Sequence, residues 1–391
     1  MFERNADVGG TWLLNDHPGC RVDVASHNYT YSFAPRLDWP EHFSRRDLIF
    51  DYFRDFAESS GVRTAITFGA EVVRATFRED LGRWEILVRT TDGERTATAD
   101  IFVCATGQLN QPNLPDVPGR DSFARPSFHS ARWNHDVELT GRRVAVIGTG
   151  ASAFQFIPVV AGQAERLLVL QRNPGWLIPT PNVHDSIPGS LRWLRDNGVY
   201  AAALQRDNVE LVTERIARIT PRGIVMADGT EHEVDVIIYG TGFRASEFLT
   251  PMQVVGRGGI DLHTRWKGDS RAYLGVTVPD FPNMFLLYGP NTNLVIHGSI
   301  VMFTECEVVH MMECLRHLLT SGRRAMDCRP EAHDRYNAWI DEGNALRAWG
   351  YSTVSIWYKN ATGRSSQNWP YSILDFWERT RRLDPADYEL L

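Results

Sequence analysis

The chain has 391 residues, with 41 basic and 48 acidic side chains and a formal net charge of −7. This length suffices for two or three domains with full cores, and the absence of long charge runs argues against nucleic acid as a partner. No apolar run reaches the length of a membrane span and no signal-peptide pattern is present, so we expect a cytoplasmic protein without a membrane partner. Five cysteines without paired spacing indicate reduced thiols, and no metal-ligand spacing occurs.

The first residues match the end of a nucleotide-binding strand. Glu3 follows Phe2 at the point where an acidic residue would accept hydrogen bonds from a ribose, and a short glycine-containing segment comes next. A dinucleotide site also needs a strand, a glycine turn and a helix upstream of this acid, and the sequence does not contain them. We therefore expect a nucleotide-binding domain that lacks its first βα unit.

Two hairpin patterns occur along the chain. Residues 84–88 and 96–103 flank Asp92-Gly93, and the second arm runs into Ala105-Thr106-Gly107. Residues 223–226 and 231–238 flank Asp228-Gly229 in the same way, and this arm runs into Gly240-Thr241-Gly242. The repetition suggests two related nucleotide-binding domains, with the two TG segments as crossings between them. The alternative is two unrelated hairpins.

The stretch from 142 to 172 has the clearest pattern. The apolar run 144–147 predicts a buried strand, a helix is expected over about 151–162, and 167–170 predicts a second strand. Between the first strand and the helix lies a glycine turn that would bind a pyrophosphate. Its residues are Gly148, Thr149, Gly150, Ala151 and Ser152, followed by Ala153.

The second strand ends at Gln171-Arg172 rather than at an acidic residue. A guanidinium suits the 2′-phosphate of NADP, whereas NAD sites usually place a carboxylate there. The sequence therefore predicts an NADP site. The alternative is a glycine turn in an α/β domain that binds no nucleotide.

Two helices complete the prediction. Residues 45–58 are expected to form a helix with Ser44 as its N-cap. Residues 304–318 carry Met, Val and Leu at helical spacing, which favours a packed helix over a cofactor-binding element. The fold class is then α/β, with two Rossmann-like domains of which the first is discontinuous. The expected limits are 1–137 and 240–391 for the first domain, including a C-terminal substrate-side region, and 138–239 for the second.

Together these segments resemble the flavin-dependent Baeyer–Villiger monooxygenases, most closely the 4-hydroxyacetophenone monooxygenase branch. The resemblance rests on Glu3, GGTW at 9–12, HPGCRVD at 17–23, the two TG segments, the glycine turn and the tail from Trp357 to Pro370. It implies an enzyme that uses FAD and NADPH to insert one oxygen atom from O2 beside a ketone carbonyl.

The resemblance also implies site residues. Arg192 lies in a motif similar to KRxxxDNGxY, and Asp23 is expected to orient it. Because both the oxygen-transferring species and the tetrahedral adduct are anionic in this chemistry, a guanidinium that stays charged would stabilise them. Trp357 is expected near NADP and substrate. The cofactor contacts implied are Glu3, Gly9, Gly10, Thr11, Trp12, Asp23, Gly107, Gly148, Thr149, Gly150, Ala151, Ser152, Arg172, Gly242 and Trp357.

The chain departs from the family pattern in three places. The N-terminal FAD glycine loop is missing, so we expect an N-terminally truncated relative that holds FAD weakly. The fingerprint FxGxxxHxxxW occurs around His129 with Arg125 at the glycine, and this histidine either contributes to the site or only satisfies backbone groups. The helical segment before Arg192 is short, and Leu191 replaces the lysine of the motif.

Two further readings of the function stay open. One is a flavin monooxygenase that oxidises nitrogen or sulfur, which would have less use for Arg192. The other is a non-catalytic NADP-binding remnant. For the enzyme we expect a small-molecule ketone and O2 as partners, and a homodimer is one option for its assembly.

Overall fold

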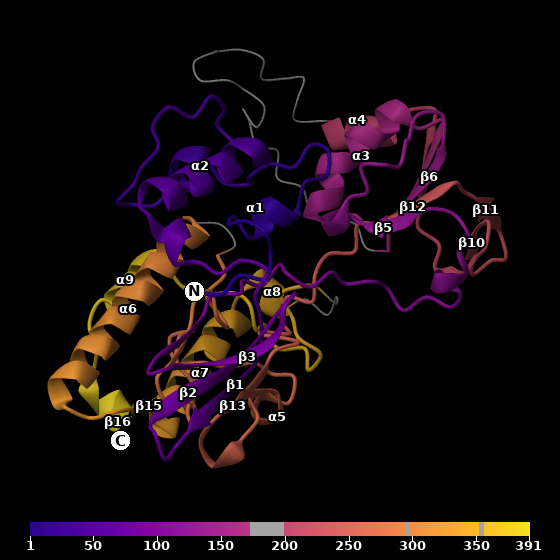
Figure 1. Cartoon of the computed structure of the whole chain (residues 1–391). Helices are drawn as coiled ribbons and strands as arrows, with labels where there is room; N and C mark the ends of the chain where they lie inside the picture. The colour runs from indigo at the N-terminus through magenta and orange to yellow at the C-terminus, as the bar shows by residue number, and fades with distance from the viewer. Residues whose placement is uncertain (173–198, 295–297, 352–355) are drawn as a thin grey trace.

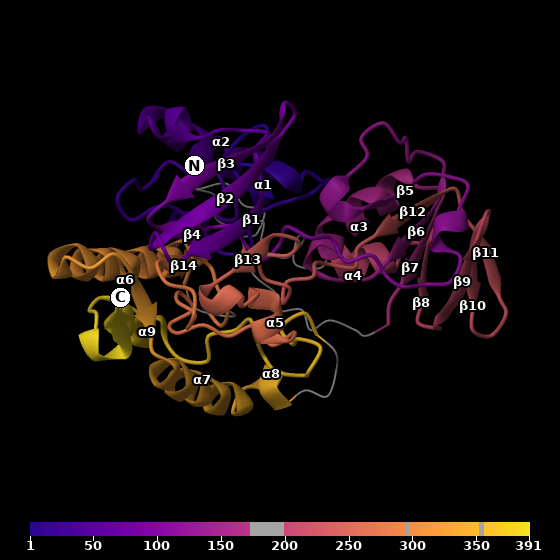
Figure 2. The same ribbon diagram turned by 60° about the horizontal axis from the view of Figure 1, so that its bottom comes forward.

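The computed structural model describes residues 1–172, 199–294, 298–351 and 356–391. These residues form two lobes that lie side by side in both views of the chain (Figures 1 and 2). Two crossings join the lobes, and they run antiparallel to each other. Pro112 forms a β-bridge with Phe243, and the Asn113 N–H donates to the Gly242 carbonyl at 2.8 Å. The two TG segments therefore lead into neighbouring crossings, as the sequence predicts.

The lobe on the right of Figure 1 contains a parallel sheet. Its strand order is β5 (Ser127–His129), β12 (Val236–Tyr239), β6 (Arg143–Ile147), β7 (Arg166–Leu170) and β8 (Val209–Val212). Helix α3 (Ala151–Gln163) connects β6 to β7, and α4 (Val199–Leu204) precedes β8. The predicted strand, turn, helix and second strand are thus confirmed.

Both faces of this parallel sheet are covered. Helix α3 packs on one face, where Val144, Phe156 and Val160 are fully buried. An antiparallel sheet of β9 (Ile216–Thr220), β10 (Gly223–Met226) and β11 (Glu231–Glu233) contributes Ile219 and Ile224 to the core on the other face. Burial on both faces explains why the strands appear in the sequence as unbroken apolar runs.

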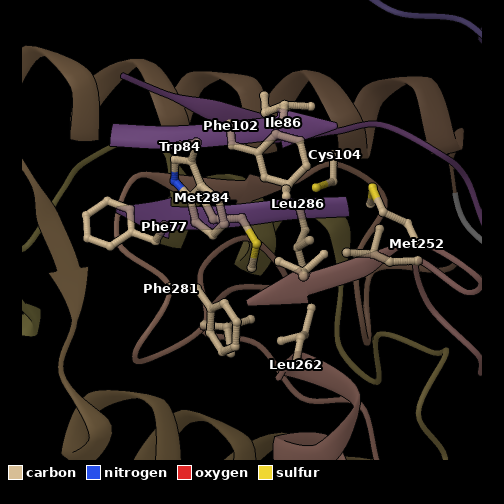
Figure 3. Close-up of a cluster of buried hydrophobic side chains, with 14 of the residues drawn as sticks. Phe77, Trp84, Ile86, Phe102, Cys104, Met252, Leu262, Phe281, Met284 and Leu286 are labelled. Atoms are coloured by element: carbon tan, nitrogen blue, oxygen red, sulfur yellow. The ribbon is translucent and has the colours of Figure 1, made fainter. Parts of the chain in front are cut away.

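The other lobe is built on a four-stranded sheet with the order β13 (Gln253–Val255), β1 (Glu71–Arg78), β2 (Arg83–Thr90) and β3 (Gly93–Ala99). Beside it, β4 (Phe102–Cys104) pairs in parallel with β14 (Met284–Leu286). Figure 3 shows the apolar core between them, where the rings of Phe77 and Phe102 each pack at a tilt on Trp84, and Met284 and Leu286 belong to the same cluster. The buried indole of Trp84 donates to the Pro282 carbonyl at 2.8 Å, so this aromatic core leaves no polar group of Trp84 unsatisfied.

The remaining elements surround this second lobe. Helix α6 packs against α9, where Phe303 and Phe376 stack with ring centroids 4.4 Å apart. The bounds of these elements are α1 (Thr11–Leu14), α2 (Arg46–Ser59), α5 (Leu262–Trp266), α6 (Ile300–Ser321), β15 (Met326–Cys328), α7 (Pro330–Ala345), α8 (Ala348–Tyr351), α9 (Ile373–Thr380) and β16 (Tyr388–Leu390). The packed helix predicted at 304–318 is confirmed by α6.

Both predicted hairpins are present, but each second arm is broken. The arm predicted as 96–103 ends at Ala99, and β4 then enters a different sheet. The arm predicted as 231–238 ends at Glu233, and β12 joins the parallel sheet. In both cases the polar outer strand and the apolar inner strand need different environments, so the chain changes sheets between them. The repeated order of hairpin, inner strand and TG segment is confirmed.

Ser44 is not the N-cap of α2, as the sequence suggested. The helix begins at Arg46, and Arg45 occupies the cap position without a side-chain hydrogen bond. Ser44 is fully buried, its N–H donates to Ser26 Oγ at 2.8 Å, and Ser26 Oγ donates to Ser44 Oγ at 2.9 Å. The hydroxyl is thus committed to the loop before the helix.

The α/β architecture with two nucleotide-binding lobes agrees with the expected fold class. In the left lobe Phe2 forms a parallel bridge with Thr67, and within the described residues no strand joins this bridge to the β4–β14 pair. The parallel sheet of the right lobe takes in residues 127–129, which precede the expected boundary at 137. The domain limits themselves stay a prediction.

Candidate active site

The glycine turn lies where β6 meets α3. Gly148 has φ of +100°, and a Cβ built there would lie 2.5 Å from the Gly240 carbonyl oxygen at the end of β12. Gly150 occupies the N-cap position of α3. Because it has no side chain to accept hydrogen bonds from the first N–H groups of the helix, these groups stay available to an anion. Ala153 is fully buried, and a Cβ on Gly240 would come within 3.0 Å of it. Small residues are therefore required on both strands.

Arg172 follows the end of β7 and is exposed. Its neighbour Gln171 donates from Nε2 to the Thr149 hydroxyl at 3.0 Å, which ties the end of β7 to the glycine turn. Arg172 therefore directly follows a residue whose side chain is tied to the turn. A phosphate-binding turn and a cation next to it are what the pyrophosphate and 2′-phosphate of NADP require.

The N-terminal residues lie on the other lobe. Glu3 directly follows the Phe2–Thr67 bridge, and its Oε1 accepts from the Asn5 N–H and Nδ2 at 2.7 and 2.6 Å. Among the described contacts Oε2 has no partner and could accept from a ribose hydroxyl. Gly9, with φ of +108°, is pressed against the Phe50 ring, since a Cβ there would lie 2.7 Å from it. Gly10, with φ of +51°, precedes the short helix α1, which starts at Thr11.

The loop that carries Asp23 is fastened to α3. Gly19 has φ of +75°, and a Cβ there would lie 2.5 Å from the Gln155 carbonyl oxygen. The Gln155 side chain donates from Nε2 to the Arg21 carbonyl at 3.0 Å and accepts from the Arg21 N–H at 3.3 Å. The His17 ring packs on Phe156 with centroids 5.7 Å apart. The HPGCRVD segment, which ends at Asp23, is thus attached to helix α3 of the other lobe.

Four chain segments meet around Asp23. Burial raises the pKa of Tyr29, Tyr288 and Tyr358, and the Asp23 carboxylate, which lies within electrostatic reach of all three hydroxyls, raises each pKa further. The surrounding protein in turn raises the pKa of Asp23 by desolvation, although its side chain is exposed to solvent. This combination is expected of a carboxylate that lines a ligand site.

Two predicted tryptophans border the same region. Trp12 donates from Nε1 to the Tyr29 hydroxyl at 3.1 Å, and the two rings meet edge to face at 5.6 Å. Trp357 is 43% exposed and packs on Tyr358, with ring centroids 4.5 Å apart. Trp12 and Trp357 therefore each contact a tyrosine that lies within electrostatic reach of Asp23. Gly107 and Gly242 are the last residues of the two TG segments, and both have a positive φ, of +70° and +74°.

Tyr288 is a site residue that the sequence did not identify. It adopts φ of +59°, a strained conformation for a bulky residue. Three contacts hold it there: its N–H donates to Glu307 Oε2 at 2.7 Å, its carbonyl accepts from Gln108 Nε2 at 3.1 Å, and its hydroxyl donates to Asn293 at 2.9 Å. The available signal was its place just after β14, at the same sheet edge as the TG segment that follows β4.

His129 is buried at the end of β5. Its Nδ1 accepts from the Ala131 N–H at 3.1 Å, which satisfies a backbone group. Burial lowers the pKa of His129 to about 4, so the ring is neutral at pH 7. Nε2 lies beside the Gly242 backbone, which opposes part of this shift, but it makes no well-formed hydrogen bond within the described residues.

Other predictions fall elsewhere. Arg192 and Leu191 lie outside the described residues. No group of His, Cys, Asp and Glu that could hold a metal ion occurs in the part of the chain that the structure describes. No helix among the described residues is long and apolar enough to cross a membrane.

A surface cavity of about 310 Å³ lies away from Asp23, and its cations are already paired. Arg265 is bonded to Asp280 at 2.6 Å, and Arg271 to both Asp269 and Asp341 at 2.8 Å. These cations are therefore neutralised by carboxylates of the protein itself. The residues lining the cavity are Arg265, Trp266, Asp269, Arg271, Val278 and His333.

Solved structures share this architecture. A steroid monooxygenase bound to NADP is 26% identical in sequence and superposes with a TM-score of 0.83. The match covers 100% of this chain and 94% of the steroid monooxygenase chain. A closed form of cyclohexanone monooxygenase is 24% identical, with a TM-score of 0.86. This match covers 100% of this chain and 93% of the cyclohexanone monooxygenase chain, and at this identity it supports the fold alone.

Sequence relatives agree with the structural ones. Residues 1–186 match the FMO-like family, described as flavin-binding monooxygenase-like. A Baeyer–Villiger monooxygenase of Streptomyces coelicolor is 34% identical over 100% of this chain and 87% of its own length. A Baeyer–Villiger monooxygenase of Pseudomonas aeruginosa is 30% identical over 100% of this chain and 86% of its own. Since the Streptomyces coelicolor relative aligns over the whole of this chain at this identity, the chain belongs to the flavin-binding monooxygenase family.

Proposed function

We propose that the chain is an FAD- and NADPH-dependent monooxygenase that inserts one oxygen atom from O2 next to a ketone carbonyl, giving an ester or lactone. One observation carries this proposal: the loop bearing Asp23 is fastened to α3, directly behind the glycine turn, by the Gly19–Gln155 approach and the Arg21–Gln155 hydrogen bonds. A nicotinamide nucleotide whose pyrophosphate is held at the turn would then lie beside the loop that carries Asp23.

The described residues fit NADPH. The open N-terminus of α3 can receive the pyrophosphate, and Arg172 beside the turn can pair with the 2′-phosphate. Gly148 and Gly150 leave room for phosphate oxygens because neither carries a side chain. When bound, NADPH supplies the reducing equivalents, and this chain positions it.

For FAD the fit is partial. Glu3 has a carboxylate oxygen left for a ribose, and Trp12, Tyr29 and Tyr288 surround the region where a ring system would lie. Within the described residues, the unit in which a glycine turn joins a strand directly to a helix occurs once, at 143–163, and that is the NADP side. When bound, FAD supplies the oxygen-transfer chemistry, and no phosphate contact for it follows from these residues.

The residues of this chain then have distinct tasks in the proposal. Arg192, through the family motif, provides a fixed positive charge for the anionic adduct. Asp23 orients that guanidinium, since it is the carboxylate that the α3-bound loop presents at the site. Trp357, packed on Tyr358, closes the substrate side and helps to exclude water. His129 stays neutral and takes no proton in this scheme.

We also assign the chain to the 4-hydroxyacetophenone monooxygenase-like branch, with a shortened segment before Arg192. The alignment with the Streptomyces coelicolor relative supports the shortening. It runs over 458 positions, more than the 391 residues of this chain, so the relative has internal residues without a counterpart here. We also propose that this chain assembles as a homodimer.

The test compares Arg192→Ala with the parent chain supplied with FAD and NADPH. We expect flavin reduction, followed by stopped-flow absorbance, to be retained, because hydride transfer needs only stacked rings. Ester yield from an aryl ketone should fall on the order of a hundred- to a thousandfold. Arg206→Ala, an exposed arginine after α4, serves as the matched control and should change neither rate. Ester formation at the parent rate by Arg192→Ala would refute the assignment.

The same assays separate the alternatives. A parent that makes no ester but oxidises thioethers would be a nitrogen- or sulfur-oxidising monooxygenase. A parent that binds NADP+ yet shows no flavin reduction in the presence of excess FAD would be a non-catalytic remnant. Asp23→Ala should give a milder form of the Arg192→Ala defect, because the guanidinium would be less well oriented.

A further inference from the structure

Helix α6 presents an unpaired stripe to solvent. Figures 1 and 2 both place this 22-residue helix at the margin of the molecule, and α9 packs beside it. Most of the stripe is apolar and well exposed, and its positions alternate by three and four residues, as in a coiled-coil seam. Its members are Met302, Glu305, Val309, Met312, Arg316 and Leu319.

The exposure of the apolar members is high. Met302 and Val309 are each 46% exposed, Met312 is 55% exposed and Leu319 is 81% exposed. The opposite face of α6 holds the fully or nearly buried side chains that pack on α9 and the core, so the four apolar members of the stripe lie outside the core. Four such side chains in one line on a helix mark an interaction surface.

The stripe is complementary to itself when reversed. In an antiparallel pair of α6 helices with the two-fold axis between Val309 and Met312, each of these two residues meets the other in the second copy. On either side Glu305 then meets Arg316, and at the ends Met302 meets Leu319. Every apolar residue faces an apolar one, and both carboxylates face guanidinium groups. This is the property that an isologous interface requires.

The contacts already made by the two charges do not oppose this pairing. The Ser32 N–H donates to Glu305 Oε1 at 2.7 Å, and Oε2 has no partner among the described contacts. Arg316 is 67% exposed and bonds to Glu313 on its own helix at 2.6 Å, an exposed pair of small energetic value. Phe33, next to Ser32 and 68% exposed, adds apolar surface at the end where Leu319 of the second copy would arrive.

We propose that α6 forms the two-fold interface of a homodimer by antiparallel packing of this stripe against the same stripe of a second copy. The partner is a second copy, and not a different protein, because the charge order Glu305 then Arg316 matches its own reverse. The interface lies on the outer side of α6, so it leaves the site around Asp23 open. The proposal does not depend on the reaction catalysed.

The first experiment measures mass by light scattering after gel filtration over a range of protein concentrations. The parent should run as a dimer, and Leu319→Glu should shift it towards monomer. Leu346→Glu is the matched control, since Leu346 is 80% exposed at the end of α7 and away from the stripe. A monomeric parent at all concentrations, or equal behaviour of the two variants, would overturn the proposal.

The second experiment tests the antiparallel register. Glu305→Arg alone and Arg316→Glu alone each place like charges opposite one another and should weaken dimerisation about tenfold. Mixing the two variants restores both ion pairs in the heterodimer, so the mixture should regain the parent mass. This outcome also controls for loss of the Ser32 contact, because the mixture still contains Glu305→Arg. A mixture that stays monomeric would exclude this register.

Discussion

At the end of β7, Arg172 stands exposed beside Gln171, whose amide reaches the Thr149 hydroxyl in the glycine turn. The two residues should therefore affect cofactor binding differently. Gln171 braces the turn that receives the pyrophosphate, which NADPH and NADH share. Arg172 can contact the 2′-phosphate, which only NADPH carries.

We expect Arg172→Ala to weaken NADP+ binding by about 1.5–3 kcal/mol, roughly ten- to a hundred-and-fiftyfold, and to leave NAD+ binding nearly unchanged. Isothermal titration with both nucleotides measures this. Arg166→Ala is the control, because Arg166 lies at the opposite end of β7 and bonds to Glu210 on the surface. Equal losses for both nucleotides in Arg172→Ala would place the guanidinium elsewhere.

At the scale of elements, the ends of β6 and β12 approach so closely that only glycine fits between them. A Cβ on Gly148 would lie 2.5 Å from the Gly240 carbonyl oxygen, and the residue has φ of +100°. Gly141, in the turn before β6, also has a positive φ of +69°, but a Cβ there meets nothing within 4 Å. A substitution at Gly141 therefore tests backbone strain alone, whereas a substitution at Gly148 adds a steric clash to that strain.

Gly141→Ala should cost about 1–2 kcal/mol of stability, which is the strain of a left-handed alanine, and should leave NADP+ binding intact. Gly148→Ala should cost about 1–3 kcal/mol more, because the strand ends must move apart, and NADP+ binding should be lost. Urea denaturation and nucleotide titration of both variants measure the difference. If Gly148→Ala binds NADP+ like the parent, the turn does not hold the nucleotide.

At the scale of the whole molecule, the lobe that contains α6 encloses a buried acid. Glu307 is fully buried in α6, and burial raises its pKa from 4.5 to about 8. Because the folded state holds this proton more tightly than the unfolded state, the stability that protonation provides is complete at acidic pH. It is lost as the pH rises towards about 8.

Glu307→Gln should therefore gain stability relative to the parent as the pH rises from 5 to about 8, with no further change above that. The amide keeps an acceptor for the Tyr288 N–H and carries no charge. Thermal melts of both proteins across this range measure the difference. The control is Glu313→Gln on the same helix, where Arg316 lowers the pKa of the carboxyl. Its effect should stay flat from pH 5 to 8, and a flat difference for Glu307→Gln would contradict the prediction.

The sequence by itself determined the local units. Apolar runs and a glycine turn predicted β6, α3 and β7 because strand, turn and helix depend on neighbours in the chain, and the two Asp-Gly turns predicted the hairpins for the same reason. The cofactor preference also follows from sequence, since it depends on which residue ends β7. Even so, the local signal failed at Ser44, whose hydroxyl is committed to Ser26, eighteen positions earlier in the chain.

The tertiary structure alone decided what these units build together. Nothing in the local pattern says that the second arm of each hairpin leaves for another sheet, since both parts favour strands. Nor could it show that Gln155 fastens the Asp23 loop to α3, or that Tyr288 is held at φ of +59° by Gln108 and Glu307. These contacts join residues far apart in sequence. They form only when the two lobes have folded, because burial and chain crossing, and not propensity, bring the partners together.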